Sequence, residues 1–405
     1  MRKKLKILFI VTEDWYFYSH RMAVGKAAMR NGYEVWLATR VKNHGDLISR
    51  EGIHLLPLQE FNRKLENPFS EFRKFSELLK VLRRLQPDIL HNVAMKPVVF
   101  GTLAAHIVGV PTIVNALAGM GFLFISSHPT IGLLRRLFIL SLRILMRSNR
   151  VGMIVQNETD RRLLISERIT SEHQIALIRG SGFDPAIFRF EPEDATGLPI
   201  VILPSRMLID KGVEQFVDAA RFINHKRRVA NFVLVGQPDE DNPASIPRAR
   251  LQAWHREGAV EWWGHKNAMS NVFAQSNIIC LPSYREGLPK VLVEAAACGR
   301  AIVTTDVPGC NDVVHHGVNG LLVPPRSSRR LASAILKLIR NPQLREKMGK
   351  NGRQRVLSTF SESAVTDDTL KFYDHMTCRA YNPCRFASST ENALLCSDAA
   401  EEPSV

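Results

Sequence analysis

The segment "NIICLPSYREGLPKVLVEAAACGRAIVTTDV", residues 277–307, decides the fold class of this 405-residue chain. It opens with a short apolar run that predicts a buried strand, and residues 301–307 form a second such run. Between them, a loop containing Gly287 and Pro289 precedes the apolar residues 290–298, which predict a helix because Pro suits the first helical turn. A strand, a helix and a strand in this order predict a parallel sheet covered by helices.

The same alternation extends along the chain in both directions, and it occurs twice. Strand and helix patterns alternate from residue 6 to about residue 157, and the pattern begins again at residue 199 and continues to about residue 359. We therefore predict an α/β chain with two doubly wound, Rossmann-like domains that face a cleft. Ligands of such sheets bind beyond the carboxyl ends of the strands, so we expect the functional residues on the loops that follow the strands.

The predicted domains have boundaries that follow from composition. An N-terminal domain occupies residues 1–186 and a C-terminal domain residues 187–365, with a linker in the Pro- and Gly-containing segment 183–199. Residues 366–405 are expected to form a terminal helix and a disordered tail, because the polar sequence after about residue 376 has no period.

The charge of the chain is distributed unevenly. The net charge is +15, and residues 1–190 carry 28 Lys and Arg against 15 Asp and Glu, whereas the remainder carries 26 against 24. A basic first half suggests phosphates, nucleic acid or an anionic membrane as its partner, although a basic surface without a partner is also common. The six cysteines have no zinc or disulfide spacing, which favours a reducing cytoplasm, and no apolar run is long enough to span a membrane.

Two glutamates in the opening segment lie where few carboxylates are expected. Glu286 is on the loop, and Glu294 lies inside the apolar helix pattern. A buried carboxylate is costly without hydrogen-bond donors, so Glu294 should meet either a neighbouring loop or the hydroxyls of a ligand such as a ribose. The spacing alone leaves both interpretations open.

Two cations follow another predicted strand. Arg206 and Lys211 are placed between the end of the strand pattern at residues 199–204 and the start of a helix pattern. Guanidinium and ammonium groups beside a helix N-terminus suit a diphosphate and stabilise it as a leaving group. Solvated surface cations are the alternative.

Together these motifs resemble a known family. "SRMLIDKG" (205–212), the segment 264–325 and the Glu-x7-Glu pair are similar to the family 4 retaining glycosyltransferases of GT-B fold. The resemblance implies a glycosyltransferase of hexosyltransferase type that needs no metal or other cofactor. It implies that Arg206 and Lys211 bind the donor diphosphate, and that Glu286 holds the transferred sugar. The remaining implied donor contacts are Glu294 at the ribose, the backbone of Gly287, Leu288 and Pro289 at the sugar and phosphate, and Gly264 and His265 near the nucleobase. With the site empty, we expect Glu294 to bond only to water or to nearby backbone.

The N-terminal half resembles a narrower branch of that family. "HNVAMKPVVFGTLAAHIVGVPTIVNALAGMGFLF" (91–124), "IRGSGFDPAIF" (178–188) and residues 17–35 look like enzymes that extend polyprenyl-diphosphate-linked saccharides in capsule, O-antigen or glycan assembly. The Gly-Gly turn that many relatives place after the first strand is absent here. The resemblance implies that His20, Arg21, Lys96 and Asn115 face the acceptor or a phosphate, with Tyr16 and Ser19 in the same loop.

The function implied is transfer of a sugar, with retention, from a UDP-sugar to a lipid-linked saccharide. Residues 130–150 and 63–84 are basic and amphipathic, which is typical of helices that lie on an anionic membrane or of ordinary basic domain helices. We therefore expect a cytoplasmic protein attached peripherally to the inner face of the membrane. The alternatives are a nucleotide-sugar epimerase of the same architecture and a nucleic-acid-binding protein that uses the basic half. Against nucleic acid, the sequence has no interleaved aromatic platform and no recognition-helix motif.

Overall fold

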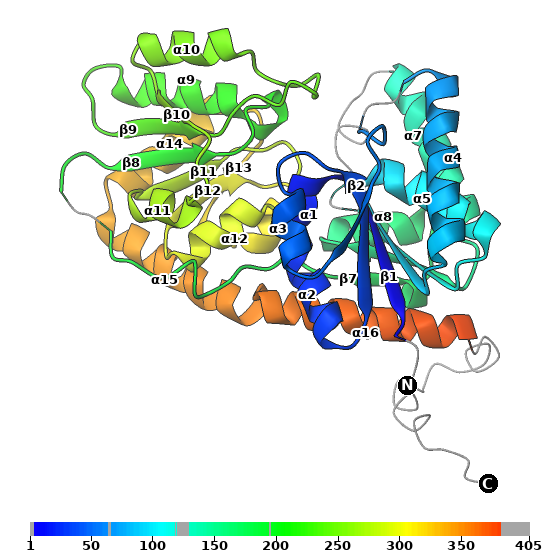
Figure 1. The fold of residues 1–405 in the computed structure, drawn as a ribbon. Helices are drawn as coiled ribbons and strands as arrows, with labels where there is room; N and C mark the ends of the chain where they lie inside the picture. The colour runs from blue at the N-terminus through cyan, green and yellow to red at the C-terminus, as the bar shows by residue number, and fades with distance from the viewer. Residues whose placement is uncertain (1–3, 64–65, 118, 120–128, 194–195, 382–405) are drawn as a thin grey trace.

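The computed structural model describes residues 4–63, 66–117, 119, 129–193 and 196–381. Two parallel sheets form two domains, the N-terminal one on the right of Figure 1 and the C-terminal one on the left. The tail predicted to be disordered lies, beyond residue 381, outside the described residues.

The described part of the N-terminal domain contains a seven-stranded sheet in which every strand pair is parallel. The strand order reverses between β1 and β4, which makes the gap between these two strands the switch point of the sheet. β1 is buried along almost its whole length, as expected for a strand covered on both faces. In spatial order the strands are β3 (His54–Pro57), β2 (Glu34–Arg40), β1 (Lys6–Glu13), β4 (Ile89–Val93), β5 (Thr112–Leu117), β6 (Val151–Val155) and β7 (Ile175–Leu177).

The C-terminal domain repeats this plan with a six-stranded parallel sheet across its described residues. Its strand order reverses between β8 and β11. A large apolar core packs the sheet against helices on each face. In spatial order the strands are β10 (Glu261–Gly264), β9 (Asn231–Val235), β8 (Ile200–Pro204), β11 (Ile278–Leu281), β12 (Ala301–Thr305) and β13 (Gly320–Val323).

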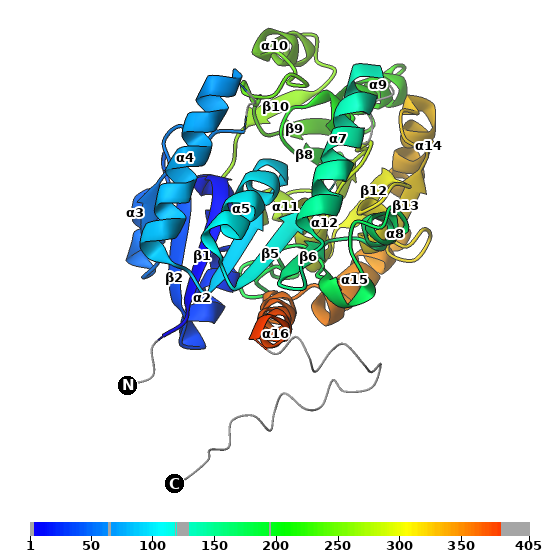
Figure 2. The same cartoon turned by 90° about the vertical axis from the view of Figure 1, so that its right-hand side faces the viewer.

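Helices connect the strands in both domains. Figure 2 shows α4, α5 and α7 together on one outer face of the N-terminal sheet. None of the described helices is both long enough and apolar enough to cross a membrane. The helices of the N-terminal domain are α1 (Asp14–His20), α2 (Met22–Arg30), α3 (Gly45–Arg50), α4 (Pro68–Leu85), α5 (Met95–Val108), α7 (Pro129–Leu145) and α8 (Glu158–Ser166). Those of the C-terminal domain are α9 (Val213–Asn224), α10 (Arg248–Arg256), α11 (Met269–Ala274), α12 (Lys290–Ala297), α13 (Cys310–Val313), α14 (Ser328–Ile339) and α15 (Pro342–Thr359).

The last helix returns to the first domain. α16 (Glu362–Tyr381) runs beneath the N-terminal sheet after α15 has left the C-terminal domain (Figure 1). Its Tyr373 is fully buried and shares a hydrogen bond of 2.5 Å with His91 of β4. Gly152 of β6 makes room for it, because a Cβ there would lie 2.8 Å from the ring of Phe372. The helix predicted near the C-terminus is therefore part of the N-terminal core rather than a separate section.

The predicted architecture of two doubly wound domains is confirmed. The short edge strands β3 and β7 were not predicted, because each is only three or four residues long and neither is fully buried. α5 begins at Met95, earlier than the helix pattern at residue 101, since Pro97 falls in the first turn where no backbone N–H is required. The helix predicted from about residue 20 to 31 is α2, and the short helix α1 before it, which ends next to Arg21, was not predicted.

Candidate active site

The motif residues of the C-terminal domain gather at the switch point of its sheet. β8 and β11 are neighbours, and Val201 and Ile202 pair with Ile278 and Ile279. The loops after these two strands therefore leave the sheet side by side. They carry the predicted cations and Glu286, at the place where open parallel sheets bind ligands, and Glu294 follows in α12.

Lys211 and Glu286 form the central contact of this site. Lys211 Nζ lies 2.5 Å from Glu286 Oε1, and Ser283 Oγ donates to the same oxygen at 2.6 Å. Gly212 allows the approach, because its φ is +72° and a Cβ there would lie 2.2 Å from the carbonyl oxygen of Pro282. Both charged side chains are mostly buried, with 16% and 11% of their surface exposed. The structure thus brings together one cation and one glutamate that the sequence had placed 75 positions apart.

Arg206 contacts a different carboxylate. Its Nη1 lies 2.7 Å from Asp239 Oδ2, and Arg63 of the N-terminal domain lies 3.3 Å from the same oxygen. Burial raises the pKa of Asp239, but the bond from Arg206 and the charge of Arg63 outweigh it and hold the pKa below its usual value. Asp239 therefore joins the two domains as a carboxylate between two guanidinium groups.

Glu294 has a side-chain partner, and our expectation that it bonds only to water or backbone was wrong. Its Oε1 lies 3.6 Å from Nζ of Lys290, one turn earlier on α12. Burial raises the pKa of Glu294, while the charge of Lys290 opposes the rise. Lys290 also donates to the carbonyl oxygen of Ser19 in the other domain, at 2.6 Å. The i,i+4 spacing on a helix brings this pair together, a relation that was readable in the sequence.

The loop at Gly287 touches the N-terminal domain closely. Asn157 Nδ2 donates to the carbonyl oxygen of Gly287 at 2.9 Å, and Asp160 forms an ion pair with Arg285. A Cβ at Gly119 would lie 2.8 Å from the backbone nitrogen of Gly287. Both domains therefore fix the position of this loop.

Leu288 and Pro289 complete the same loop. A Cβ at Gly180 of the N-terminal domain would lie 2.7 Å from Leu288 Cδ2, so that glycine is required for the contact. Pro289 is the N-cap residue of α12, one position before the first turn in which we had expected it. The free N–H groups of the α12 N-terminus consequently open beside the loop.

Gly264 and His265 lie at the end of β10. The carbonyl oxygen of Gly264 accepts a hydrogen bond from Gly236 at 2.8 Å, and Gly264 has a φ of +68°. His265 is exposed and bonds to Asn267 at 3.0 Å. Their predicted place near a nucleobase stays a prediction.

His20 and Arg21 lie at the end of α1, beside the domain interface. The His20 ring stacks on Tyr16 with ring centroids 4.3 Å apart, and its Nδ1 lies 2.5 Å from Ser19 Oγ. Burial, with the charges of Lys290 and Arg21, lowers the pKa of His20 to about 3. The ring is therefore neutral at pH 7. Arg21 is buried, and its Nη1 lies 3.5 Å from the carbonyl oxygen of Gly180.

The structure does not bring Lys96 and Asn115 to this group. Lys96 pairs with Glu71 of α4 at 2.8 Å. Asn115 is fully buried, and its Oδ1 accepts bonds from Asn92 and Thr102, both at 2.9 Å. A ligand contact by Asn115 would require this buried network to open.

Sequence reasoning missed the residues of the N-terminal domain that hold the donor-side loop. Asn157 and Asp160 form the start of α8, where Asn157 caps the helix by accepting a bond from the Asp160 N–H. The sequence "NETD" directly after a strand pattern carries the N-cap signal. That signal predicts a helix start, but only the folded chain places it against Gly287.

Comparisons with known proteins agree with this geometry. The family described as "Glycosyl transferase 4-like" matches residues 6–151, and "Glycosyl transferases group 1" matches residues 186–355. The chain is 29% identical over 384 residues to the N,N'-diacetylbacillosaminyl-diphospho-undecaprenol alpha-1,3-N-acetylgalactosaminyltransferase of Campylobacter jejuni, covering 92% of this chain and 99% of the relative.

A second relative and a solved structure extend the comparison. The UDP-Gal:alpha-D-GlcNAc-diphosphoundecaprenol alpha-1,3-galactosyltransferase of Escherichia coli is 22% identical over 76% of this chain and 80% of its own length. The fold matches HepE of Anabaena, solved with UDP and glucose, with a TM-score of 0.72 at 17% identity over 91% of this chain and 99% of HepE.

The comparisons give no support to the epimerase or the nucleic-acid-binding alternative. The two family matches cover both sheets, and the motif residues meet at the switch point of the second one. The chain therefore combines a domain of the glycosyl transferase 4-like type with one of the glycosyl transferases group 1 type, and it is a glycosyltransferase with the GT-B arrangement of two Rossmann-like domains.

Proposed function

We propose that this enzyme transfers a sugar, with retention of configuration, from a UDP-sugar to a saccharide carried on a polyprenyl diphosphate in cell-surface polysaccharide synthesis. The names of the relatives from C. jejuni and E. coli support such an acceptor, and the E. coli name supports the UDP donor. The observation that carries the proposal is the contact between Lys211 and Glu286 at the switch point of the C-terminal sheet, with Arg206 on the same loop as Lys211.

The donor diphosphate would lie between Arg206, Lys211 and the N-terminus of α12. Both cations are paired with carboxylates, so the incoming diphosphate would exchange one anionic partner for another instead of desolvating an isolated charge. Glu286 would then accept bonds from hydroxyls of the transferred sugar. Glu294 would accept bonds from the ribose, with Lys290 still able to bond to the Ser19 carbonyl oxygen across the cleft.

The reaction needs no protein nucleophile. The bond from the anomeric carbon to the diphosphate oxygen breaks while the acceptor oxygen bonds to that carbon on the same face. The acceptor proton passes to an oxygen of the departing diphosphate. Arg206 and Lys211 would neutralise the charge that grows on this leaving group, where fixed charges stabilise a transition state strongly.

The acceptor would approach from the N-terminal domain. His20 and Arg21 lie beside the donor-side helix, since Ser19 accepts the bond from Lys290. Because the His20 ring is neutral, it can exchange hydrogen bonds with hydroxyls without adding positive charge. If Lys96 contacts a phosphate as predicted, it must first release Glu71, its present partner.

A lipid-linked acceptor requires contact with a membrane, and α7 offers a surface for it. Its exposed apolar side chains follow one stripe of the helix, and Arg136 and Arg143 are exposed on the same helix. Phe69 and Phe72 of α4 are exposed as well, although α5 lies between α4 and α7 (Figure 2). Apolar side chains bordered by cations suit peripheral binding to the anionic cytoplasmic leaflet. The stripe comprises Leu133, Leu134, Leu137, Leu140 and Ile144.

A donor panel tests the proposal. The purified enzyme is incubated with individual nucleotide sugars and the lipid-linked saccharide fraction of the membranes, and products are read by mass spectrometry. We expect one UDP-sugar to be consumed, with a saccharide longer by one residue and an anomeric configuration unchanged by NMR. Inversion would refute the retaining mechanism. Absence of transfer from every UDP-sugar would refute the donor assignment.

A further inference from the structure

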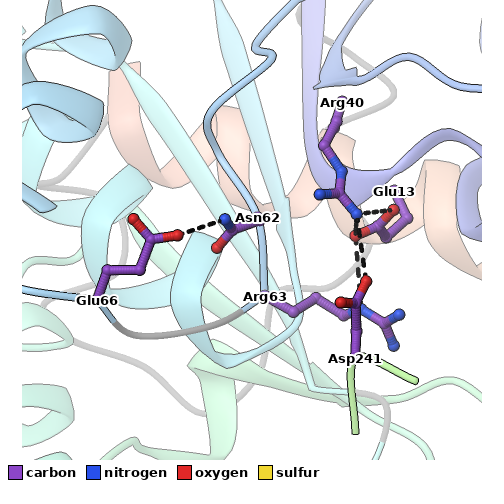
Figure 3. A pocket seen from close by; sticks show the side chains of 6 residues that line it. All are labelled: Glu13, Arg40, Asn62, Arg63, Glu66 and Asp241. Atoms are coloured by element: carbon purple, nitrogen blue, oxygen red, sulfur yellow. Dashed lines mark hydrogen bonds and ion pairs between the residues drawn. The ribbon is translucent and has the colours of Figure 1, made fainter. Parts of the chain in front are cut away.

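A cavity of about 260 Å³ lies at the carboxyl ends of β1 and β2, where the two domains meet. It is lined by Glu13, Arg40, Asn62, Arg63 and Glu66 of the N-terminal domain and Asp241 of the C-terminal domain (Figure 3). The residues assigned to the donor do not line it. Its volume lies below the roughly 300–1,000 Å³ of sites that enclose a whole drug-sized ligand, so it suits one ring of a larger molecule.

The wall of the cavity is held rigidly by a buried carboxylate. The Glu13 side chain is 2% exposed, and both of its oxygens accept bonds from Arg40 Nη2, at 2.8 and 3.0 Å. Arg63 Nε lies 3.6 Å from Glu13, and Arg63 Nη1 lies 3.3 Å from Asp239. The guanidinium groups are therefore fixed before any ligand arrives, which reduces the entropy lost on binding.

The wall of the cavity also contains polar atoms that could still form hydrogen bonds. Asn62 Oδ1 and Arg40 Nε are buried atoms without a hydrogen-bond partner among the described residues. Buried polar atoms normally have partners, so one acceptor and one donor beside the same cavity point to a polar ligand. Arg63 lies over the ring of Trp15, 5.9 Å from its centroid, which adds an aromatic surface near the cavity.

The charges of the lining residues indicate which class of ligand the cavity binds. Three carboxylates face two guanidinium groups, and Lys42 and Lys74 pair with two of these carboxylates, Glu13 and Glu66. The charges around the cavity therefore nearly cancel, and they offer no clear excess of positive charge to a phosphate or a diphosphate. Carboxylates, an amide and fixed guanidinium groups together can donate to and accept from the hydroxyl and amide groups of a neutral sugar ring.

We propose that this cavity receives a sugar ring of the acceptor saccharide and selects the acceptor by that ring. The inference rests on the proposed function, because only a glycosyl acceptor brings such a ring to this edge of the sheet. Arg63 connects the cavity through Asp239 to Arg206, so the ring binds against a wall that also contacts the donor-side cation. The diphosphate and lipid parts of the acceptor remain outside the cavity.

Two variants test the cavity without touching the donor residues. Asn62→Ala removes the amide, and Glu66→Gln keeps the size of the side chain but removes its charge. Glu60→Gln is the matched control, since Glu60 is exposed, pairs with Arg73 and does not line the cavity. The probes are the lipid-linked saccharide fraction of the membranes and the polyprenyl phosphates left after mild acid has removed the saccharides.

We expect both cavity variants to raise KM for the saccharide-bearing lipid about 10-fold, the loss typical of one or two hydrogen bonds to a ligand. Three quantities should be the same in the cavity variants as in the wild type and in Glu60→Gln. They are the slow hydrolysis of the donor without acceptor, kcat for transfer, and the binding of the saccharide-free lipid to the enzyme. An unchanged KM in both variants would overturn the inference, and so would equal weakening for the saccharide-free lipid. A wild type that consumes no UDP-sugar would instead refute the proposed function. Direct binding of the two lipid fractions to wild type and variants would then still decide whether the cavity recognises sugar.

Discussion

The two sheets share a topology, yet their switch points are built differently. In the C-terminal domain, the loops after β8 and β11 bring Lys211 to Glu286 within one domain. At the end of β1 in the N-terminal domain, Glu13 is satisfied by Arg40 of β2 and approached by Arg63, which also reaches Asp239 of the other domain. The proposed donor site is thus assembled from two adjacent loops, whereas the proposed acceptor site is assembled from distant segments and needs both domains. The switch point of a sheet can therefore carry a site formed by adjacent loops in one domain and a site formed by distant segments in the other.

The largest effect is expected from a change in the proposed donor site alone. Glu286→Gln removes the carboxylate that pairs with Lys211 and, in our proposal, holds the transferred sugar. We expect transfer to fall on the order of 10³-fold, the upper range for losing one preorganised polar group at a reacting centre. The measurement is initial rate at saturating donor and acceptor, with the melting temperature as a check on folding. Glu257→Gln, at an exposed pair with Arg221 in the same domain, is the control. Near-normal turnover in Glu286→Gln would remove Glu286 from the reaction.

A second test separates membrane contact from chemistry. Changing Arg135, Arg136 and Arg143 of α7 to Ser should lower binding to anionic liposomes by about 150-fold, since each cation near such a surface contributes about 1 kcal/mol. Flotation at low salt measures the bound fraction, and transfer to a detergent-dispersed acceptor should be unaffected. Replacing Lys226, Arg227 and Arg228, which are exposed in the C-terminal domain, removes the same charge as a control. If both triple variants lose binding equally, net charge rather than α7 is responsible.

A third test concerns the contact through which the N-terminal domain holds the donor loop. Asn157→Ser keeps a residue that caps α8 but loses the amide that donates to the Gly287 carbonyl oxygen. We expect kcat/KM for the donor to fall about 10-fold, the loss equivalent to one hydrogen bond of about 1.4 kcal/mol. Steady-state kinetics and urea unfolding are measured together. A variant with normal kinetics would show that the bond from Asn157 is not needed to position the loop.

The smallest expected effect concerns His20 and pH. Because the fold lowers the pKa of His20 to about 3, the unfolded chain binds a proton near pH 6.5 that the folded chain does not bind. Stability from this group is present above pH 6.5 and is lost as pH falls toward 3. Between pH 7.5 and 5.5 the loss is about 1.4 kcal/mol. The difference in unfolding free energy between His20→Gln and wild type should change by that amount between the two pH values. A pH-independent difference for His20→Gln would contradict the neutral, buried ring.

Much of the fold was readable because burial on both faces of a parallel sheet produces continuous apolar runs. Residues 278–281 and 301–305 were recognised as strands for this reason, and β3 was missed because its four residues lie partly exposed at an edge. Of the candidate site, Lys211 and Glu286 were predicted and do meet. Glu294 was expected to lack a side-chain partner, although Lys290 one turn away could have been foreseen. The family resemblance placed Asn115 at the acceptor or a phosphate, but its side chain is part of a buried network.

By itself, the sequence determined the two parallel sheets and the donor-side motif, because strand burial and loop position after a strand are properties of short segments. Only the tertiary structure decided the acceptor side. Glu13, Arg40, Asn62 and Asp241 come together at one cavity through the packing of two domains, and α16 closes the first domain from the far end of the chain. Contacts between residues tens to hundreds of positions apart leave no local pattern in a single sequence, since any of many surface charges could satisfy them equally well.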